Sequence, residues 1–190
     1  MLADLISRTR RNHGLEHATI HVLSQKKTGF SAQGNSTPHG FFLNIYGDVS
    51  EGEVHDAVHE AYSRMKGGET QLALHPNCGT VLLTTATMSA LAAQATFSLE
   101  QRRQRSSKMS LPVLLSALPA AVLAVTTMLI VSRPLGMALQ QHFTTDGNLG
   151  DLEVTGVRKI TPSPVTRLFQ VLLGQTGAEQ VRAYQITTTG

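Results

Sequence analysis

Cysteine, tryptophan and charged residues are all scarce in this chain. Among 190 residues there is one cysteine, Cys78, and no tryptophan, and charged residues make up 15% of the composition. A single cysteine excludes an intrachain disulfide, so nothing indicates an oxidising compartment. The apolar run at the N-terminus is too short for a signal peptide. These absences turn attention to the distribution of charge along the chain.

The charge balance is basic, with a formal net charge of +3 and a pI near 9.3. Basic residues form two short clusters, at Arg8–Arg11 and Arg102–Lys108. Nucleic-acid binding would need an extended basic surface, and single strands also need aromatic side chains on which bases stack. Because the chain has no tryptophan and no aromatic-rich strand, we expect no nucleic-acid partner.

Two long segments of the chain carry no charge. Val81–Leu99 and Ser110–Ser132 contain no Asp, Glu, Lys or Arg, and each approaches the roughly 20 residues that a membrane-spanning helix needs. The loop Gln101–Lys108 between them is basic, as cytoplasmic loops of membrane proteins are. We therefore expect a transmembrane hairpin over residues 79–134 and an integral membrane protein, placed in a bacterial inner membrane.

The segment before the hairpin alternates helix and strand patterns. Helical spacing predicts one helix over Leu2–Ser24, and Ser50 with Glu53 forms a capping box that begins a second helix. The stretch Phe30–His39 is rich in Gly, Ser and Asn, which predicts a loop. Phe41–Tyr46 predicts a strand.

Two further strand patterns follow the hairpin. They are Leu152–Ile160 and Val181–Ile186, joined by a connection that contains Pro and Gly. With Phe41–Tyr46 they would complete a small sheet. The expected fold class is α+β, in three parts: an N-terminal metal-binding α+β domain (1–78), the transmembrane hairpin (79–134) and a C-terminal tail with two short strands (135–190).

The first predicted helix carries histidines four residues apart. His13 and His17 lie one turn apart on one face, where both can bind one metal ion, and His21 continues the stripe. Glu16 flanks that face. The resulting H-x-x-E-H arrangement is that of inverzincin peptidases, in which two histidines bind zinc and the glutamate activates water. The alternative is a polar helix face with solvated or core-paired histidines.

A second motif, His75-Pro-Asn-Cys78, has the two-residue gap common to paired zinc ligands. Pro76 restricts the local backbone, and Gly79 permits a close approach of the chain. A small buried thiol is the alternative interpretation of Cys78. The candidate ligands of a zinc cofactor are thus His13, His17, His75 and Cys78, with Glu16 as the candidate catalytic residue.

The pairing of these two motifs resembles the YqhQ-like family of bacterial membrane proteins, which are described only as candidate metal-dependent enzymes. A longer pattern is similar to a domain-of-unknown-function family, number 6391; it runs through His13–His21, Gly40-Phe-Phe42, Tyr46–Val49, Gly68-Glu69 and His75–Thr80. The resemblance covers about 12–80. It implies metal or catalytic roles for the candidate residues named above, and it supplies no known reaction.

Three functions remain open at this point. If all four candidate ligands bind, the tetrahedral shell is full and the zinc is structural. If one is absent, water can take its place and Glu16 can act as general base. We expect a membrane-anchored zinc-binding protein that is either a peptidase-like hydrolase or a non-enzymatic membrane subunit or assembly factor. A metal-sensing or delivery role is the third hypothesis. The expected partners are the lipid bilayer and a protein partner or a second copy of the chain.

Overall fold

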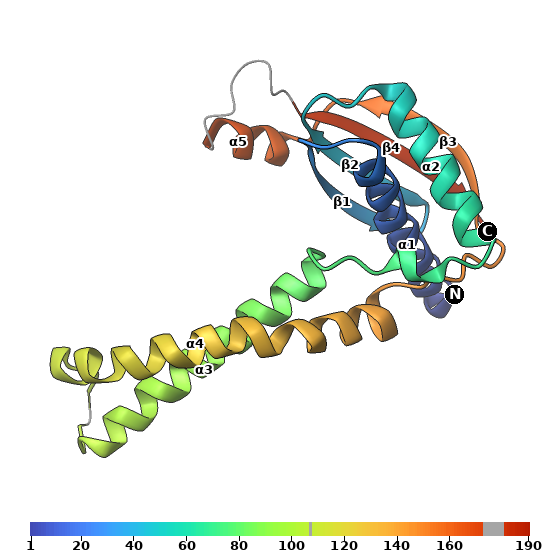
Figure 1. The fold of residues 1–190 in the computed structure, drawn as a ribbon. Coiled ribbons are helices and arrows are strands. Elements are labelled where there is room, and N and C mark those ends of the chain that lie inside the picture. The colour runs from blue at the N-terminus through green and yellow to red at the C-terminus, as the bar shows by residue number, and fades with distance from the viewer. Residues whose placement is uncertain (107, 173–180) are drawn as a thin grey trace. The chain divides into compact units, whose positions relative to one another are not determined.

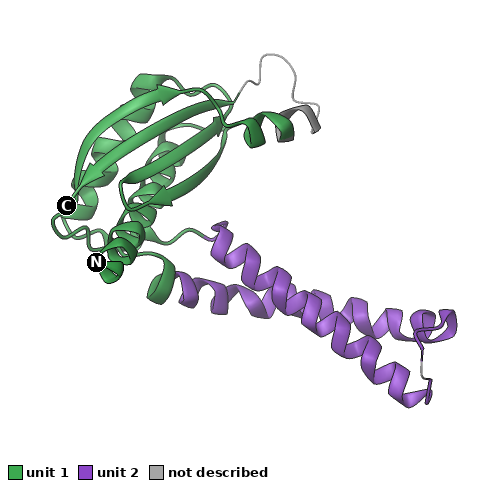
Figure 2. Cartoon of the chain, turned by 180° about the vertical axis from the view of Figure 1, so that it is seen from behind, with its two compact units in different colours: residues 1–75, 141–190 green, residues 76–140 purple. Residues whose placement is uncertain are grey.

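The computed structural model describes residues 1–106, 108–172 and 181–190, which divide into two compact units (Figure 2). The first unit consists of Met1–His75 and Gln141–Gly190, and the second of Pro76–Gln140. The chain therefore leaves the first unit after His75 and re-enters it at Gln141. The N-terminal and C-terminal segments of the described chain build one unit together.

The first unit is built on a four-stranded antiparallel sheet (Figure 1). Its strands lie in the order β1-β2-β4-β3, and their bounds are β1 Ser31–Thr37, β2 Gly40–Tyr46, β3 Glu153–Ile160 and β4 Arg182–Thr189. The three predicted strands are confirmed, and they share one sheet as expected. Because β4 pairs with both β2 and β3, the C-terminal segment completes the sheet that the N-terminal segment begins.

Strand β1 shows that the prediction of a loop over Phe30–His39 was wrong. The strand pairs with β2 from Ser31 opposite Tyr46 to Thr37 opposite Gly40. Its Gly, Ser and Asn residues are typical of loops by composition, but pairing with β2 satisfies their backbone groups. Strand β1 lies at the edge of the sheet, where apolar residues on alternate positions are not required.

Helices α1 (Leu2–Lys26) and α2 (Glu51–Lys66) cover one face of the sheet (Figure 1). Helix α1 contacts β1 and β2, and α2 contacts α1 and β3. Both predicted helices are confirmed. Their apolar faces and one face of the sheet form the core, whose fully buried members include Leu15, Val22, Phe41, Leu43, Ile45, Val54, Val58 and Ile186. Burial of this apolar surface is the main stabilising term of the unit.

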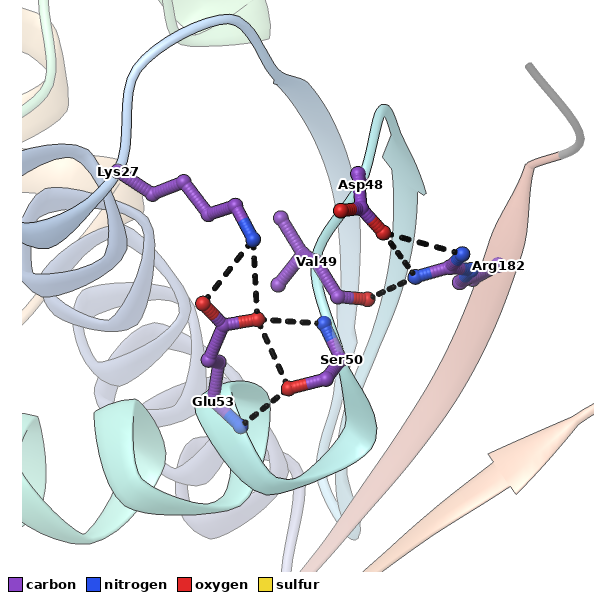
Figure 3. Close-up of polar contacts among 6 residues, drawn as sticks. All are labelled: Lys27, Asp48, Val49, Ser50, Glu53 and Arg182. Atoms are coloured by element: carbon purple, nitrogen blue, oxygen red, sulfur yellow. Dashed lines mark hydrogen bonds and ion pairs between the residues drawn. The ribbon is translucent and has the colours of Figure 1, made fainter. Parts of the chain in front are cut away.

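Polar contacts fix the start of α2 on both sides (Figure 3). The Glu53 carboxylate accepts hydrogen bonds from the Ser50 backbone N–H at 2.6 Å and from Lys27 Nζ at 3.0 Å. The Ser50 hydroxyl accepts in turn from the Glu53 backbone N–H, which confirms the predicted capping box. Arg182 on β4 donates to the Val49 carbonyl oxygen at 2.6 Å. The first turn of α2 is thereby tied to the end of α1 and to the sheet.

Three shorter elements complete the first unit. They are the 3-10 helix η1 (Thr70–Ala73), the π-helical turn η2 (Gln140–Thr144), which begins at the last residue of the second unit, and helix α5 (Pro164–Leu172). Helix α5 lies between β3 and β4, where the sequence predicted only a connection with Pro and Gly. Residues 173–180 of that connection lie outside the described residues.

The second unit is a hairpin of two long helices, α3 (Gly79–Arg103) and α4 (Leu111–Leu139) (Figure 2). Small residues on α4 let the two backbones approach closely. A Cβ added at Gly136 would lie 2.9 Å from Val81 Cα. The Ser132 hydroxyl donates to Thr85 Oγ1 at 2.8 Å, which adds a polar contact between the helices.

The prediction of two transmembrane helices was wrong for one of them. In the described part of the chain a single helical run, Leu111–Thr144, is long and apolar enough to cross a membrane by length and composition. Helix α3 lacks charge from Gly79 to Leu99, but threonine, serine and Gln94 make that stretch only moderately apolar. An uncharged run is therefore not equivalent to an apolar one. Ser107, within the predicted basic loop Gln101–Lys108, lies outside the described residues.

The capping box predicts how stability depends on pH. Hydrogen bonds from the backbone and side chain of Ser50, and then from Lys27, lower the pKa of Glu53 from 4.5 to about 2. Since the folded-state pKa is lower than the unfolded one, the ionised carboxylate stabilises the fold above pH 4.5, and this contribution is lost as pH falls toward 2. We expect Glu53→Gln to lower the thermal unfolding temperature at pH 7 and to change little near pH 2.

The matched control is Glu51→Gln, which removes a carboxylate from the same first turn of α2 but outside the capping box. We expect a smaller decrease in unfolding temperature at pH 7 for this variant. Equal decreases for the two variants would contradict a specific contribution of the capping box.

Candidate metal centre

Four histidine rings of the first unit form a row along α1. Their order in space is His13, His17, His75, His21. Ring centroids are 4.4 Å apart for His13 and His17, 5.9 Å for His17 and His75, and 4.9 Å for His75 and His21. We call this set the histidine row. Three members come from successive turns of α1, and the fourth comes from the point where the chain leaves the unit. The structure thus brings together the candidate ligands His13, His17 and His75, and His21, which the sequence placed on the same stripe of the helix, lies beside His75.

Backbone carbonyl groups orient the first two rings. His13 Nδ1 donates to the Thr144 carbonyl oxygen at 2.8 Å, and His17 Nδ1 donates to the Ala73 carbonyl oxygen at 2.7 Å. A carbonyl oxygen only accepts, so in each neutral ring Nδ1 carries the hydrogen and Nε2 carries the lone pair. Histidines that bind metals are commonly held in this way, with one nitrogen donating to a carbonyl and the other facing the ion.

His21 has the opposite orientation. Its Nε2 donates to the Leu74 carbonyl oxygen at 2.8 Å, so the lone pair of the neutral ring lies on Nδ1. Ala73 and Leu74 are consecutive residues at the end of η1, and their carbonyl oxygens accept from consecutive turns of α1. Buried Leu72 and Ala73 hold η1 in the core beside α1. Sequence spacing alone could not identify these acceptors.

Gly14 allows the returning chain to cross α1. A Cβ at this position would overlap the Asp146 carbonyl oxygen and would lie 3.2 Å from the Ala73 Cβ. The Asp146 N–H donates to the Arg10 carbonyl oxygen at 3.0 Å, and the Arg10 guanidinium donates to the Thr145 carbonyl oxygen at 3.0 Å. Glycine inside a helix is therefore used here for close approach, and this approach brings the histidine-binding carbonyl groups to α1.

Glu16 lies over strand β1. The Ser36 hydroxyl donates to Glu16 Oε2 at 2.6 Å, and a Cβ added at Gly34 would overlap the Glu16 side chain. The Glu16 residue is 4% exposed. A buried carboxylate is costly unless hydrogen bonds compensate it, so the small residues of β1 provide both space and a donor. This neighbour accounts for Gly34 and Ser36 of β1.

Cys78 lies near the start of the second unit, which begins at Pro76. It is the N-cap of α3, and its Sγ accepts from the Thr80 backbone N–H at 3.5 Å. Only three residue steps separate it from His75, which limits the distance between their Cα atoms to about 10 Å. The His75-Pro-Asn-Cys78 motif thus joins the histidine row to the first turn of α3 by a short tether.

The other paired histidines lie elsewhere in the first unit. His55 and His59 occupy the exposed side of α2, opposite its buried face, with ring centroids 4.4 Å apart. They are separate from the histidine row and serve below as a control.

The fold and the histidine row define a small α+β unit whose chain is interrupted by a helical hairpin. Residues 8–157 match the family described as Domain of unknown function (DUF6391), and the chain belongs to this family. That confirms the family number expected from the sequence. The resemblance to YqhQ-like proteins stays a prediction.

One curated relative is an uncharacterized protein of Picosynechococcus sp. strain PCC 7002. It is 32% identical over 146 residues, which cover 72% of this chain and 65% of the relative. The chain therefore spans slightly less than two thirds of that protein's length. No solved structure matches the chain.

The crossing at Gly14 leads to a prediction about stability. In an open helix position Gly→Ala stabilises by up to about 1 kcal/mol, but at Gly14 the new methyl group would displace the Asp146 carbonyl group. We expect Gly14→Ala to destabilise the protein by about 1–3 kcal/mol, as overpacking does. Denaturant unfolding of the purified chain measures this.

Gly52 provides the matched control because it lies in α2 with nothing within 4 Å of an added Cβ. We expect Gly52→Ala to leave stability unchanged or to raise it slightly. If Gly14→Ala were as stable as Gly52→Ala, the close crossing would be contradicted.

Proposed function

We propose that this protein is a membrane-anchored zinc-binding protein whose metal centre is built on His13 and His17. The observation that supports this most directly is the orientation of the two rings. Both place the lone pair on Nε2, and their centroids are 4.4 Å apart. Two imidazoles on one tetrahedral zinc, with Zn–N distances near 2.0–2.1 Å, have centroids about 5 Å apart. The observed spacing is close to this value.

His75 and Cys78 are the proposed further ligands. Their spacing is that of paired zinc ligands, and the short tether keeps Cys78 near the histidine row. A set of imidazole and thiolate ligands favours zinc over magnesium or calcium, which prefer oxygen. The metal would then join α1 to the segment in which the first unit ends and α3 begins.

The proposed partner of the second unit is the lipid bilayer of a bacterial inner membrane. Helix α4 belongs to the one helical run of the described chain with the length and composition of a span. It exposes many large apolar side chains, among them Leu114, Leu115, Leu118, Leu123 and Ile130. Apolar surface of this extent is typical of membrane or protein contacts. Polar Thr87 and Gln94 on the exposed side of α3 suit a protein partner or a second copy of the chain.

The first candidate activity is zinc-dependent hydrolysis, with Glu16 as general base. Glu16 is buried and directly precedes His17 in the sequence. Within the motif it occupies the sequence position of the glutamate that activates water in H-x-x-E-H sites. Bound zinc would supply Lewis acidity and lower the pKa of water. In this proposal His13 and His17 hold the ion, Ser36 orients the Glu16 carboxylate, and Glu16 accepts the proton of the attacking water.

The second candidate is a non-enzymatic membrane subunit or assembly factor with a structural metal. It is favoured by the carbonyl groups that the histidines contact. His13 holds the segment by which the chain returns, at Thr144, and His17 holds the departing segment, at Ala73. A metal on the same rings would stiffen both attachments, with Glu16 as a supporting hydrogen-bond acceptor.

Glu16→Gln separates the two candidate functions because it keeps the shape of the side chain and removes the base. A hydrolase is expected to retain its zinc in this variant and to lose about 10²-fold to 10⁴-fold in rate. The measurements are metal content of the detergent-purified chain by mass spectrometry and hydrolysis of peptide and ester substrate panels.

His17→Ala is the companion variant and is expected to lower zinc content in either case. Hydrolysis that is equal in Glu16→Gln and the wild type would contradict the hydrolase proposal. A wild-type protein that binds no zinc at micromolar concentrations would contradict the metal centre itself.

Membrane anchoring through α4 is tested by alkaline carbonate extraction of cell membranes. The wild-type chain is expected to stay in the membrane pellet. Leu123→Arg places a charge near the middle of the proposed span, where insertion costs about 2.5–3.5 kcal/mol, and is expected to increase the extracted fraction. Leu168→Arg, at an exposed leucine of α5, is the control and is expected to change nothing. Full extraction of the wild type would refute the anchor.

A further inference from the structure

We propose that the first unit binds a second divalent transition-metal ion, with His21 and His75 as its paired ligands. The inference rests on the proposed zinc centre at His13 and His17 and revises its ligand set. The sequence assigned His75 to the same ion as His13 and His17 and gave His21 no role. The structure places His75 nearer to His21 than to His17.

The ring distances separate the histidine row into two pairs. Imidazoles that share a tetrahedral ion have centroids about 5 Å apart. His75 and His21 are 4.9 Å apart with an interplanar angle of 56°, whereas His75 and His17 are 5.9 Å apart. Of the two neighbouring histidines, His21 is therefore the one whose distance from His75 matches a shared ion more closely.

One ion cannot serve the whole histidine row. His13 and His21 are eight residues apart on α1, so their Cα atoms are about 12 Å apart along the helix axis. A zinc ion needs nitrogen atoms within about 2 Å, and His21 offers the lone pair on Nδ1, near the helix, so this axial separation is too long for one ion to bind both rings. Two ions, each shared by neighbouring rings, satisfy these distances.

The carbonyl contacts also distinguish His21 from His17. His17 donates through Nδ1, so its lone pair is at the outer tip of the ring, on Nε2. His21 donates through Nε2, so its lone pair is on Nδ1, near the helix. Although the two residues are one turn apart, their lone pairs lie at different distances from the axis of α1. This difference favours separate ions for the two rings.

The site on His21 and His75 differs in accessibility from the first pair. Both residues are half-buried, whereas His17 is 3% exposed. Two imidazole ligands leave coordination positions that water can fill, so the second ion is expected to exchange more readily. Imidazole is a suitable ligand for zinc, copper and nickel, and zinc is the probe because the first centre is proposed to hold it.

This assignment bears on the activity of the first centre. When His75 belongs to the second ion, the first keeps His13, His17 and Cys78 as protein ligands. A zinc ion with three protein ligands has one position for water, which is the arrangement of catalytic rather than structural zinc sites. The two-ion arrangement therefore supports the hydrolase candidate, with Glu16 as its base.

The experiment is a zinc titration of the full chain, purified in detergent and stripped with a chelator, with free zinc followed by a competing dye. The wild type is expected to bind two zinc ions per chain. His21→Ala is expected to bind one, with the affinity of the tighter site unchanged within about twofold. Because the alanine variant also loses the bond to Leu74, His21→Gln is measured beside it; its side-chain amide can still donate there.

The surface pair on α2 supplies the control. A double variant, His55→Ala with His59→Ala, removes two exposed rings with the same 4.4 Å spacing as the first pair. It is expected to retain both zinc ions. Loss of an ion in this variant, with two ions kept in His21→Gln, would overturn the proposal by placing the second site on α2.

The remaining outcomes distinguish this inference from the proposed function. One zinc per chain in the wild type and in both His21 variants, at equal affinity, would overturn the second site and leave the His13 and His17 centre intact. No zinc in the wild type would overturn both. Two ions in the wild type and one in each His21 variant would support the second site.

Discussion

Hydrogen bonds from the imidazole rings of α1 to backbone carbonyl oxygens are the interactions on which the candidate site depends. Each bond fixes three things together: the orientation of a ring, its tautomer and the position of a chain segment. His13 holds the returning segment, and His17 and His21 hold the departing one. A single bond contributes only about 0.5–1.5 kcal/mol to stability. Their larger effect is to fix which nitrogen of each ring carries the lone pair, which is the preorganisation that the proposed metal centre requires.

These bonds require the backbone to come close to α1, and glycine provides the space. Gly14 has no side chain where the Asp146 carbonyl group crosses the helix, and Gly34 leaves room for Glu16 above β1. With larger residues at those two positions, the histidines could still lie on one face of α1. The chain segments that carry their carbonyl acceptors could not approach the helix, and the Glu16 carboxylate could not occupy its place over β1. Residues without side chains thus determine where the reactive side chains lie.

The predictions from sequence succeeded where periodicity is local. The spacing of His13 and His17 suffices to place them together, because four residues make one helical turn. The pairing of His75 with His21 depends on where η1 packs, and no local pattern specifies that. Strand β1 was predicted as a loop because its residues are small and polar. Two of them, Gly34 and Ser36, contact Glu16, and the strand lies at the sheet edge. Helix α3 was read as a span because absence of charge was taken for apolarity.

Connectivity links the proposed metal centre to the path of the chain. The second unit is inserted between His75 and Gln141, and the segments on both sides of the insertion are held by α1 histidines. In the proposed metal centre, an ion bound by these rings would restrain the backbone segments of the first unit that precede and follow the insertion. If His75 binds with His21, the departing segment is fixed one turn further along α1 than His17 would fix it. In this proposal the choice of partner for His75 would decide two properties at once: whether the first ion has an open position, and where along α1 the departing segment is held.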